Sequence, residues 1–282
     1  MSNAIDRRTF VASSAAALVG VAAGARDGRT PGQGRRLERI GLQLYTVREL
    51  MQESVPDTLH RVAAVGYDEV EFAGYFGVSA AHLRTMLRDT GLDAPSAHVG
   101  LDAVRADPEA LIESALTLGH RYLIVAWLAP ADRTGPDAWR RVADEFNAFG
   151  ARCRAANLSF GYHNHDFEFA PTDGQMPYGI LLDACDPDLV TMELDLFWIR
   201  AGGQDPLEWF SRYPGRFRLC HVKDMDRDGA MVDVGRGVID FGSVFAASER
   251  AGLQHWFVEH DTPADPLASI ERSYRALATL TF

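Results

Sequence analysis

The chain has 282 residues, of which 47% are apolar and 24% charged, a composition that suits a globular protein with a sizeable core. Its formal net charge of -11 argues against the basic face that a protein needs to neutralise nucleic-acid phosphates, so we expect no nucleic-acid partner. Three cysteines (Cys153, Cys185 and Cys220) are an odd number without short spacing, which predicts free thiols rather than a disulfide set or a metal knuckle.

The first predicted element is an export signal. Arg7 and Arg8 precede an apolar run, "VASSAAALVGVAAGA", that carries no charge before Arg26 and ends in small residues. A basic start, an apolar stretch of about 15 residues and a small-residue end are typical of a signal peptide and short for a membrane span. The arginine pair resembles a twin-arginine signal, although Asp6 stands where that signal usually has a small hydroxyl residue. We expect residues 1–38 to be signal and linker, and the protein to be exported to the periplasm with no membrane span in its mature form; an uncleaved anchor helix is the alternative.

Beyond this segment the chain repeats one small pattern, in which a helical stretch ends in Gly or Asn and a β-branched or aromatic run follows directly. The capping positions are Gly66, Gly91, Gly119, Asn157 and Gly252. With three further apolar runs, the sequence predicts eight strands, which start near residues 40, 68, 93, 121, 158, 190, 216 and 255. Helices are expected at 54–65, 79–90, 107–119, 136–156, 178–184, 205–212, 240–251 and 264–280.

Eight strands that are each followed by a helix over roughly 245 residues have the size and rhythm of a (β/α)8 TIM barrel. A doubly wound open sheet is the rival fold. It normally has a glycine-rich phosphate-binding turn after its first strand, whereas this chain reads "LYTVRELM" there. No low-complexity linker interrupts the pattern, so we expect residues 39–282 to form a single α/β TIM-barrel domain.

The predicted strands end in polar side chains, although the interior of a buried strand is expected to be apolar. In chain order these side chains are Gln43 and Tyr45, Glu71, His98, Trp127, His163 and His165, Glu193 and Asp195, His221 and Lys223, and Glu259. Barrel active sites gather at the C-terminal ends of the strands. A lone histidine there is more often structural, but several of them beside carboxylates favour a divalent cation such as Mn, Mg, Co or Zn.

Seven stretches between about Ile40 and Leu280 have to be considered together, because each alone is weakly specific. They are "GLQLYTVRE", "GYDEVEFAGYFG", "GYHNHDFEF", "MELDLFW", "HVKDMD", "VGRGVIDF" and "WFVEHD". Together they resemble the sugar phosphate isomerase/epimerase family with the xylose isomerase-like TIM barrel, in a subgroup marked by "YHNHDFEF". The resemblance implies one divalent metal ion held by one residue from each of strands five to eight, by position His163, Asp195, His221 and Glu259. The epimerases have a glutamate where His163 stands, and the sequence leaves open whether His163 or His165 is the ligand.

The resemblance also implies a chemistry, in which a metal ion stabilises the enediolate that forms when a base removes a proton beside a carbonyl. We expect a sugar isomerase or epimerase acting on a keto-sugar, with Glu259, His165 and Lys223 as catalytic residues. Because the strand-five glutamate is missing, a lyase or hydratase acting on 3-keto-sugars or 3-keto-glycosides is the alternative. An abasic-site endonuclease and a non-catalytic sugar-binding protein are less favoured.

The remaining candidates are expected around the substrate, a small sugar or glycoside that an upstream oxidoreductase would supply. Predicted substrate-binding residues are Gln43, Glu71, His98, Trp198 and Arg236. Glu193 is expected one layer deeper than Asp195, as a supporting charge paired to Lys or Arg. For Lys223, an ion pair with Asp224 or a barrel carboxylate is the alternative role. The sequence does not name the sugar, the metal or the oligomeric state.

Overall fold

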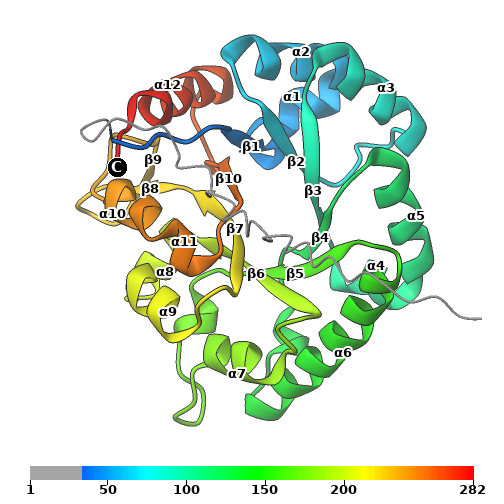
Figure 1. The fold of residues 1–282 in the computed structure, drawn as a ribbon, viewed down its shortest axis with the longest axis vertical. Helices are drawn as coiled ribbons and strands as arrows, with labels where there is room; N and C mark the ends of the chain where they lie inside the picture. The colour runs from blue at the N-terminus through cyan, green and yellow to red at the C-terminus, as the bar shows by residue number, and fades with distance from the viewer. Residues whose placement is uncertain (1–33) are drawn as a thin grey trace, which may run out of the picture. The chain divides into compact units, whose positions relative to one another are not determined.

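The computed structural model describes residues 34–282, and the predicted export signal lies outside them. Residues Arg35–Phe282 form one compact unit, an α/β TIM barrel. Eight parallel strands close it in the order β1-β10-β7-β6-β5-β4-β3-β2 (Figure 1). The strands are β1 (Gly41–Gln43), β2 (Glu69–Ala73), β3 (Asp93–Val99), β4 (Tyr122–Val125), β5 (Ser159–His163), β6 (Val190–Asp195), β7 (Phe217–Val222) and β10 (His255–Val258).

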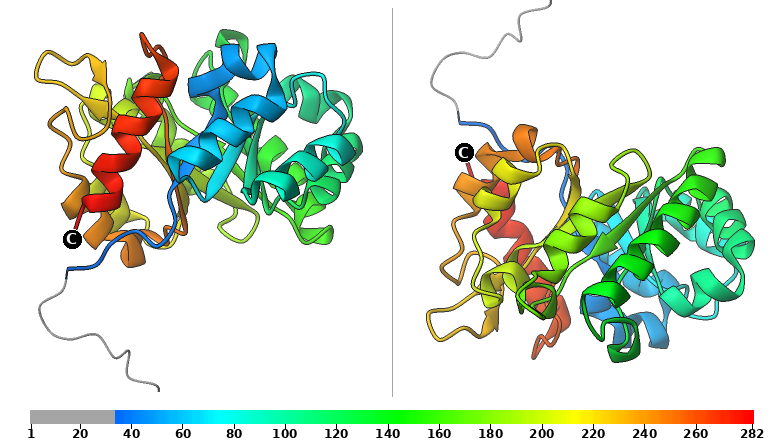
Figure 2. Two further views of the ribbon diagram at one scale, coloured as in Figure 1. Left: turned by 90° about the horizontal axis from the view of Figure 1, so that it is seen from above. Right: turned by 90° about the horizontal axis from the view of Figure 1, so that it is seen from below.

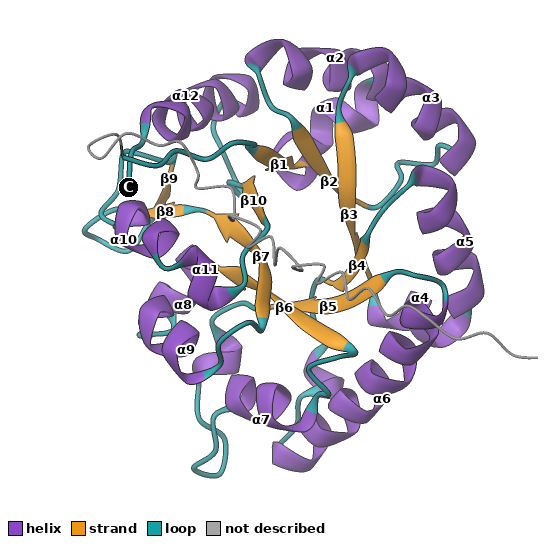
Figure 3. Cartoon of the chain, in the orientation of Figure 1, coloured by secondary structure: helices purple, strands orange, loops and turns teal. Residues whose placement is uncertain are grey.

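Helices surround the strands on the outside of the barrel (Figures 2 and 3). The larger ones are α2 (Val55–Val65), α3 (Ala80–Thr90), α5 (Pro108–Leu118), α6 (Pro136–Ala155), α7 (Pro177–Ala184), α9 (Pro206–Arg212) and α12 (Pro266–Thr279). These match predicted helices, while the one expected at 240–251 is divided into α10 (Phe241–Ala246) and α11 (Ser248–Ala251). Sequence analysis missed α1 (Arg48–Glu53), α4 (Leu101–Ala106) and α8 (Leu196–Ala201), which at six residues each are too short for a clear helical period.

The turns from helix to strand confirm the predicted caps. Gly66, Gly91, Gly119 and Gly252 have φ angles of 117°, 73°, 83° and 88°, and Asn157 has 59°. Only glycine, and less readily asparagine, enters this left-handed region at low cost, so each helix ends there and the chain turns directly into the next strand.

Strand register decides which side chains meet at the C-terminal mouth of the barrel. His163 of β5 is paired with Glu193 of β6, and Asp195 of β6 with His221 of β7. Deeper in the barrel, Tyr122, Ile124, Leu219 and Phe257 form a small apolar cluster of their own. The polar side chains at the mouth therefore rest on a packed apolar layer, as is usual for this fold.

The long connection after β7 is an ordered loop that contains the antiparallel pair β8 (Asp224–Met225) and β9 (Met231–Val232). Its anchor is the buried carboxylate of Asp224, which accepts hydrogen bonds from the backbone N–H groups of Met225, Gly235, Gly237 and Ile239 at 2.8–3.2 Å. Among residues 34–282, no helix has the length and apolar character needed to cross a membrane.

Candidate metal centre and active site

Four side chains from four neighbouring strands converge at the C-terminal mouth of the barrel. His163 and Asp195 end β5 and β6, His221 lies near the end of β7, and Glu259 follows β10. One nitrogen or oxygen atom from each of the four lies within 4.8 Å of those from the other three. All four residues are buried, so the structure brings together the set that the sequence resemblance implies.

Hydrogen bonds fix which ring nitrogen of each histidine faces the cluster. His163 donates from Nδ1 to the carbonyl oxygen of Ala126 at 3.2 Å, which leaves Nε2 facing the cluster, 3.2 Å from Oδ2 of Asp195. His221 donates from Nε2 to Oε2 of Glu71 at 2.7 Å, so its Nδ1 faces the cluster. A second hydrogen bond that orients the imidazole in this way is the usual arrangement for a metal ligand.

Asp195 is positioned by the turn from β6 into α8, of which it is the N-cap residue. Its Oδ1 accepts hydrogen bonds from the backbone N–H groups of Phe197 and Trp198 at 2.9 and 2.8 Å, which caps α8. Its backbone N–H donates to Oδ1 of Asn164 at 3.1 Å, which ties the strand end to the loop after β5. Because one carboxylate oxygen caps the helix, Oδ2 is left to face His163 and the cluster.

The cluster contains a buried ring nitrogen without a hydrogen bond, which is the test of whether a cation fits it. His221 Nδ1 lies 2.7 Å from Glu259 Oε2 without hydrogen-bond geometry and has no hydrogen-bond partner among residues 34–282, while the same Oε2 lies 2.7 Å from the ammonium of Lys223. Buried polar atoms rarely stay in that state, because losing water without a partner is costly. Two imidazole nitrogens and two carboxylates converging in this way have the chemistry of a divalent metal site.

The charges around the cluster lead to the same conclusion. Besides its own two carboxylates, Asp195 and Glu259, three more lie around it, those of Glu71, Glu193 and Asp261. Burial lowers the pKa of His221, but Glu193 and Glu259 raise it, with a net value well above the usual one. Burial raises the pKa of Asp195, but Lys223 and His163 lower it further, to about 2. The raised pKa of His221 reports the negative charge around it, which favours a bound cation, and the lowered pKa of Asp195 means that its carboxylate stays ionised.

Lys223 is a buried ammonium group at the edge of the cluster. Its Nζ lies 3.0 Å from Oδ2 of Asp195, 2.7 Å from Oε2 of Glu259 and 2.7 Å from Oδ1 of Asp261. Burial lowers its pKa, but these three carboxylates raise it well above the usual value, so the group stays charged. The ion pair anticipated as its alternative role is therefore formed with barrel carboxylates, while Asp224 holds the following loop instead.

Two predicted substrate-binding residues, Gln43 and Glu71, lie beneath the cluster and do not line the cavity above it. Glu71 accepts hydrogen bonds from Gln43 Nε2 at 2.7 Å, from Ser96 Oγ at 2.5 Å and from His221 Nε2 at 2.7 Å. Both residues are completely buried. Glu71 orients His221 through its hydrogen bond, and Gln43 in turn orients Glu71.

Glu193 also belongs to this lower layer, as its position before Asp195 predicts. Its partners are histidines, however, and not the Lys or Arg expected from the sequence. Oε2 of Glu193 lies 2.7 Å from Nε2 of His98 and 3.2 Å from Nε2 of His221. His98 links this layer to the cavity, because it also lines the opening above it.

The opening above the cluster is a cavity of about 350 Å³. Its lining residues are Tyr45, His98, Ala126, Trp127, His163, His165, Lys223, Glu259, Asp261 and Thr262. His165 therefore faces the cavity, while His163 belongs to the cluster. Burial, and next the neighbouring His163, lower the pKa of His165 to about 2, so the imidazole is neutral.

Trp198 and Arg236 are outside this lining. Trp198 is half-buried and packs against His165, with ring centroids 5.5 Å apart. Arg236 is exposed on the loop that Asp224 holds, and the structure does not bring it to the cavity. Sequence reasoning gave no role to Asp261, although its position two residues after Glu259 in "EHD" was an available signal.

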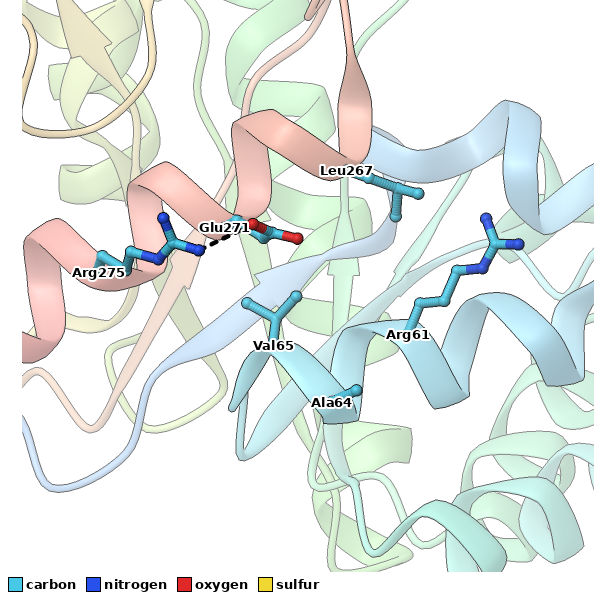
Figure 4. Close-up of a pocket in the computed structure, with 6 residues that line it drawn as sticks. All are labelled: Arg61, Ala64, Val65, Leu267, Glu271 and Arg275. Carbon is cyan, nitrogen blue, oxygen red and sulfur yellow. Dashed lines mark hydrogen bonds and ion pairs between the residues drawn. The ribbon is translucent and has the colours of Figure 1, made fainter.

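A separate hollow of about 330 Å³ lies on the outer flank, between α2 and α12 (Figure 4). Arg61, Ala64, Val65, Leu267, Glu271 and Arg275 line it. The carboxylate in this lining, that of Glu271, forms a surface ion pair of 3.0 Å with Arg275 of the same helix, α12. This hollow has none of the convergent acids and histidines of the barrel mouth.

Comparison with known proteins agrees with the fold. A model of the xylose isomerase-like TIM barrel matches residues 59–280. An inosose dehydratase from Geobacillus kaustophilus is 24% identical over 260 residues, which cover 78% of this chain and 83% of the relative. Another from Lacticaseibacillus casei is 26% identical over 140 residues, 43% of this chain and 46% of the relative, so that match spans less than half of the relative's length. A solved sugar phosphate isomerase/epimerase from Parabacteroides distasonis has a TM-score of 0.76 and 26% identity, covering 86% of this chain and 98% of the other.

Proposed function

The chain belongs to the xylose isomerase-like TIM barrel family, and we propose that it is a divalent-metal-dependent enzyme that removes a proton beside the carbonyl group of a keto-sugar. One observation carries the proposal: buried nitrogen and oxygen atoms of His163, Asp195, His221 and Glu259 converge within 4.8 Å of one another beside an open cavity. The bound cation would act as a Lewis acid on the carbonyl oxygen.

The residues of the chain supply the proton transfers. Glu259 faces the cavity and is the carboxylate base that would take the proton from carbon, leaving the electrons of that C–H bond in an enediolate. The ammonium of Lys223, 2.7 Å from Glu259, offsets the negative charge that develops on oxygen. His165 is neutral and faces the same cavity, where it can hold a sugar hydroxyl group.

The distribution of carboxylates favours elimination over epimerisation. Both carboxylates that line the cavity, Glu259 and Asp261, come from the end of β10. Two-base epimerisation needs an acid or base on each face of the carbon, and histidines stand where the second glutamate would be. In an elimination the proton that Glu259 accepts can leave with the departing oxygen group as the carbon–carbon double bond forms. The dehydratase relatives support this choice, and the proposed substrate is a 3-keto-sugar or a 3-keto-glycoside produced by an oxidoreductase.

Epimerisation or isomerisation is the second candidate, because His165 lies in the cavity as a proton relay and the Parabacteroides structure bears an isomerase/epimerase name. Incubation of the metal-loaded enzyme with a 3-keto-sugar in D₂O separates the two. Deuterium in an intact skeleton favours epimerisation, whereas loss of water or of an alcohol favours elimination. Exchange at no carbon, with or without added Mn²⁺, would contradict both.

The decisive variant is Glu259→Gln, which removes the base and weakens the cluster while keeping the shape of the side chain. We expect its exchange rate to fall by about 10²- to 10⁴-fold, the range for loss of general-base assistance. Glu249→Gln, at an exposed site in α11, makes the same change of charge and should leave the rate unaltered.

A further inference from the structure

A second hollow adjoins the catalytic cavity. It measures about 410 Å³ and shares four lining residues with that cavity: Tyr45, His98, Ala126 and Trp127. It continues over the ends of β2, β3 and β4, where its lining includes Gly74, Gly100 and Ala129. Because two hollows with common walls form one continuous opening, a ligand larger than one sugar ring can occupy both. The volume of each hollow alone lies near the lower end of the range for ligand-binding pockets.

Two exposed aromatic residues stand where the hollows meet. Tyr45 is 42% exposed and Trp127 46% exposed, which is unusual for such large apolar side chains. The guanidinium carbon of Arg48 lies 4.1 Å from the Tyr45 ring centroid, whereas that of Arg133 lies 3.7 Å from the Phe167 ring centroid and 5.8 Å from that of Trp127. Arg48 is itself fixed by hydrogen bonds of 2.8 Å to the carbonyl oxygens of Tyr45 and Asp261. Arg48 therefore fixes the Tyr45 ring, and the Trp127 ring stands exposed beside it, where the apolar face of a sugar ring can pack.

The charge of the residues that line the combined opening favours a neutral ligand over a phosphorylated one. Among residues 34–282, no Lys or Arg lines the second hollow, whose ionisable residues are Asp102, Asp132 and the shared His98. Asp132 already pairs with Arg105 at 2.8 Å. Within the same described part of the chain, the catalytic cavity has one Lys or Arg in its lining, Lys223, which three carboxylates already neutralise. A phosphate group needs free Arg or Lys donors and would meet carboxylates instead.

We propose that the substrate is a neutral glycoside of two units, with the keto-sugar in the catalytic cavity and the second sugar in the adjoining hollow against Tyr45 and Trp127. This inference rests on the proposed function, whose reaction it leaves unchanged. It assigns the second hollow to the leaving sugar. Elimination then releases a neutral sugar, whose hydroxyl group forms from the departing oxygen, and not a phosphate.

The test compares the metal-loaded enzyme acting on a 3-keto-disaccharide and on the matching 3-keto-monosaccharide. The measured quantity is the ratio of the two kcat/KM values. In Trp127→Ala, and in Gly100→Phe, which fills the hollow, we expect this ratio to fall about tenfold or more. At Gly100 an added Cβ meets no atom within 4 Å and the φ angle is -80°, so the larger side chain introduces no backbone strain. Leu116→Ala, at an exposed site in α5, is the control and should keep the ratio of the unaltered enzyme.

A binding measurement separates failure of the subsite from failure of the reaction. Calorimetry with an unoxidised disaccharide, the corresponding monosaccharide and its 6-phosphate needs no turnover. Tighter binding of the disaccharide than of both others supports the subsite even when no keto-sugar is converted. Conversion of the keto-monosaccharide with an unchanged ratio in both variants, or preferred binding of the phosphate, would overturn the subsite while leaving the proposed reaction standing.

Discussion

His221 depends on a neighbour that does not reach the substrate. Its Nε2 is held by Glu71, and Glu71 is in turn held by Gln43 and Ser96, so the orientation of Nδ1 is set from below. Such partners typically contribute about 10- to 100-fold to metal affinity. Glu71 is therefore a positioning residue, although the sequence suggested that it binds substrate.

Glu71→Gln should weaken metal binding by about 10- to 100-fold, because the amide accepts the hydrogen bond of His221 less strongly than the carboxylate does. The affinity is measured by titrating the metal-free protein with Mn²⁺ against a competing chelator. Glu113→Gln, at an exposed site in α5, is the matched change of charge and should bind metal as the unaltered protein does. Equal affinity of the two variants would show that Glu71 does not position the ligand.

A second buried carboxyl group, Glu168, has a consequence for stability. It accepts hydrogen bonds from the Tyr162 hydroxyl group and from the backbone N–H of His165, the latter at 2.9 Å, and so holds the loop after β5. Burial raises its pKa from 4.5 to about 8. Between these two pH values the folded protein keeps a proton that the unfolded chain has lost. This group therefore lowers the free energy of unfolding as the pH rises from 4.5 to 8.

Glu168→Gln should remove that slope, because the amide does not titrate. Urea unfolding measured from pH 5 to pH 8 should show the unaltered protein losing stability relative to the variant, by at most about 1.4 kcal/mol per pH unit. Glu113→Gln again serves as the control and should run parallel to the unaltered protein. A constant difference between Glu168→Gln and the unaltered protein across this range would mean that Glu168 is already ionised in the fold.

At the scale of elements, the loop between β7 and α10 shows why "VGRGVIDF" contains its second glycine. A Cβ atom at Gly237 would lie 2.2 Å from Oδ1 of Asp224 and 2.3 Å from the carbonyl oxygen of Met225. The carboxylate that gathers the loop needs this close approach. The same arrangement keeps Arg236 exposed and outside the cavity.

Gly237→Ala should destabilise the protein by about 1 to 3 kcal/mol, because the added methyl group forces the loop away from Asp224. Denaturant unfolding gives the difference directly. Gly135→Ala is the matched control, since its Cβ meets no atom within 4 Å and its φ angle of 163° is extended backbone. If the free energy of unfolding falls by the same small amount in both variants, Asp224 does not constrain the loop at Gly237.

The elements were predictable from the sequence to the extent that their signals are local. Left-handed caps such as Gly66 and Asn157 mark where helices end, and alternation along a strand places His163 on its inner face. Depth within the barrel is different, because it depends on the relative shift of neighbouring strands, which no single strand encodes. The sequence therefore assigned Gln43 and Glu71 to the cavity, whereas the structure buries both. Arg236 lies on a loop, whose path the alternation along strands does not predict.

At the scale of the whole molecule, the cluster joins β5, β6, β7 and the end of β10, which are neighbours in the closed barrel. A ligand that binds these strands only when they are assembled stabilises the folded state by mass action. The buried carboxylates repel one another, and Lys223 offsets this repulsion only in part. A bound cation relieves the remainder, which adds to the stabilisation of the folded state. We therefore expect metal binding to be coupled to unfolding of the entire barrel.

Addition of Mn²⁺ at 100 times its dissociation constant should stabilise the protein by about 2.7 kcal/mol and raise Tm, and EDTA should reverse the change. Thermal unfolding followed by circular dichroism measures both. In Asp195→Asn the shift should shrink strongly, because one of the converging oxygen ligands becomes an uncharged amide. Asp228→Asn, on the exposed part of the loop between β8 and β9, should show the full shift. If Mn²⁺, Mg²⁺, Co²⁺ and Zn²⁺ each leave Tm unchanged in the unaltered protein, the four residues do not form a metal site, and the Lewis-acid chemistry proposed for this barrel is lost with it.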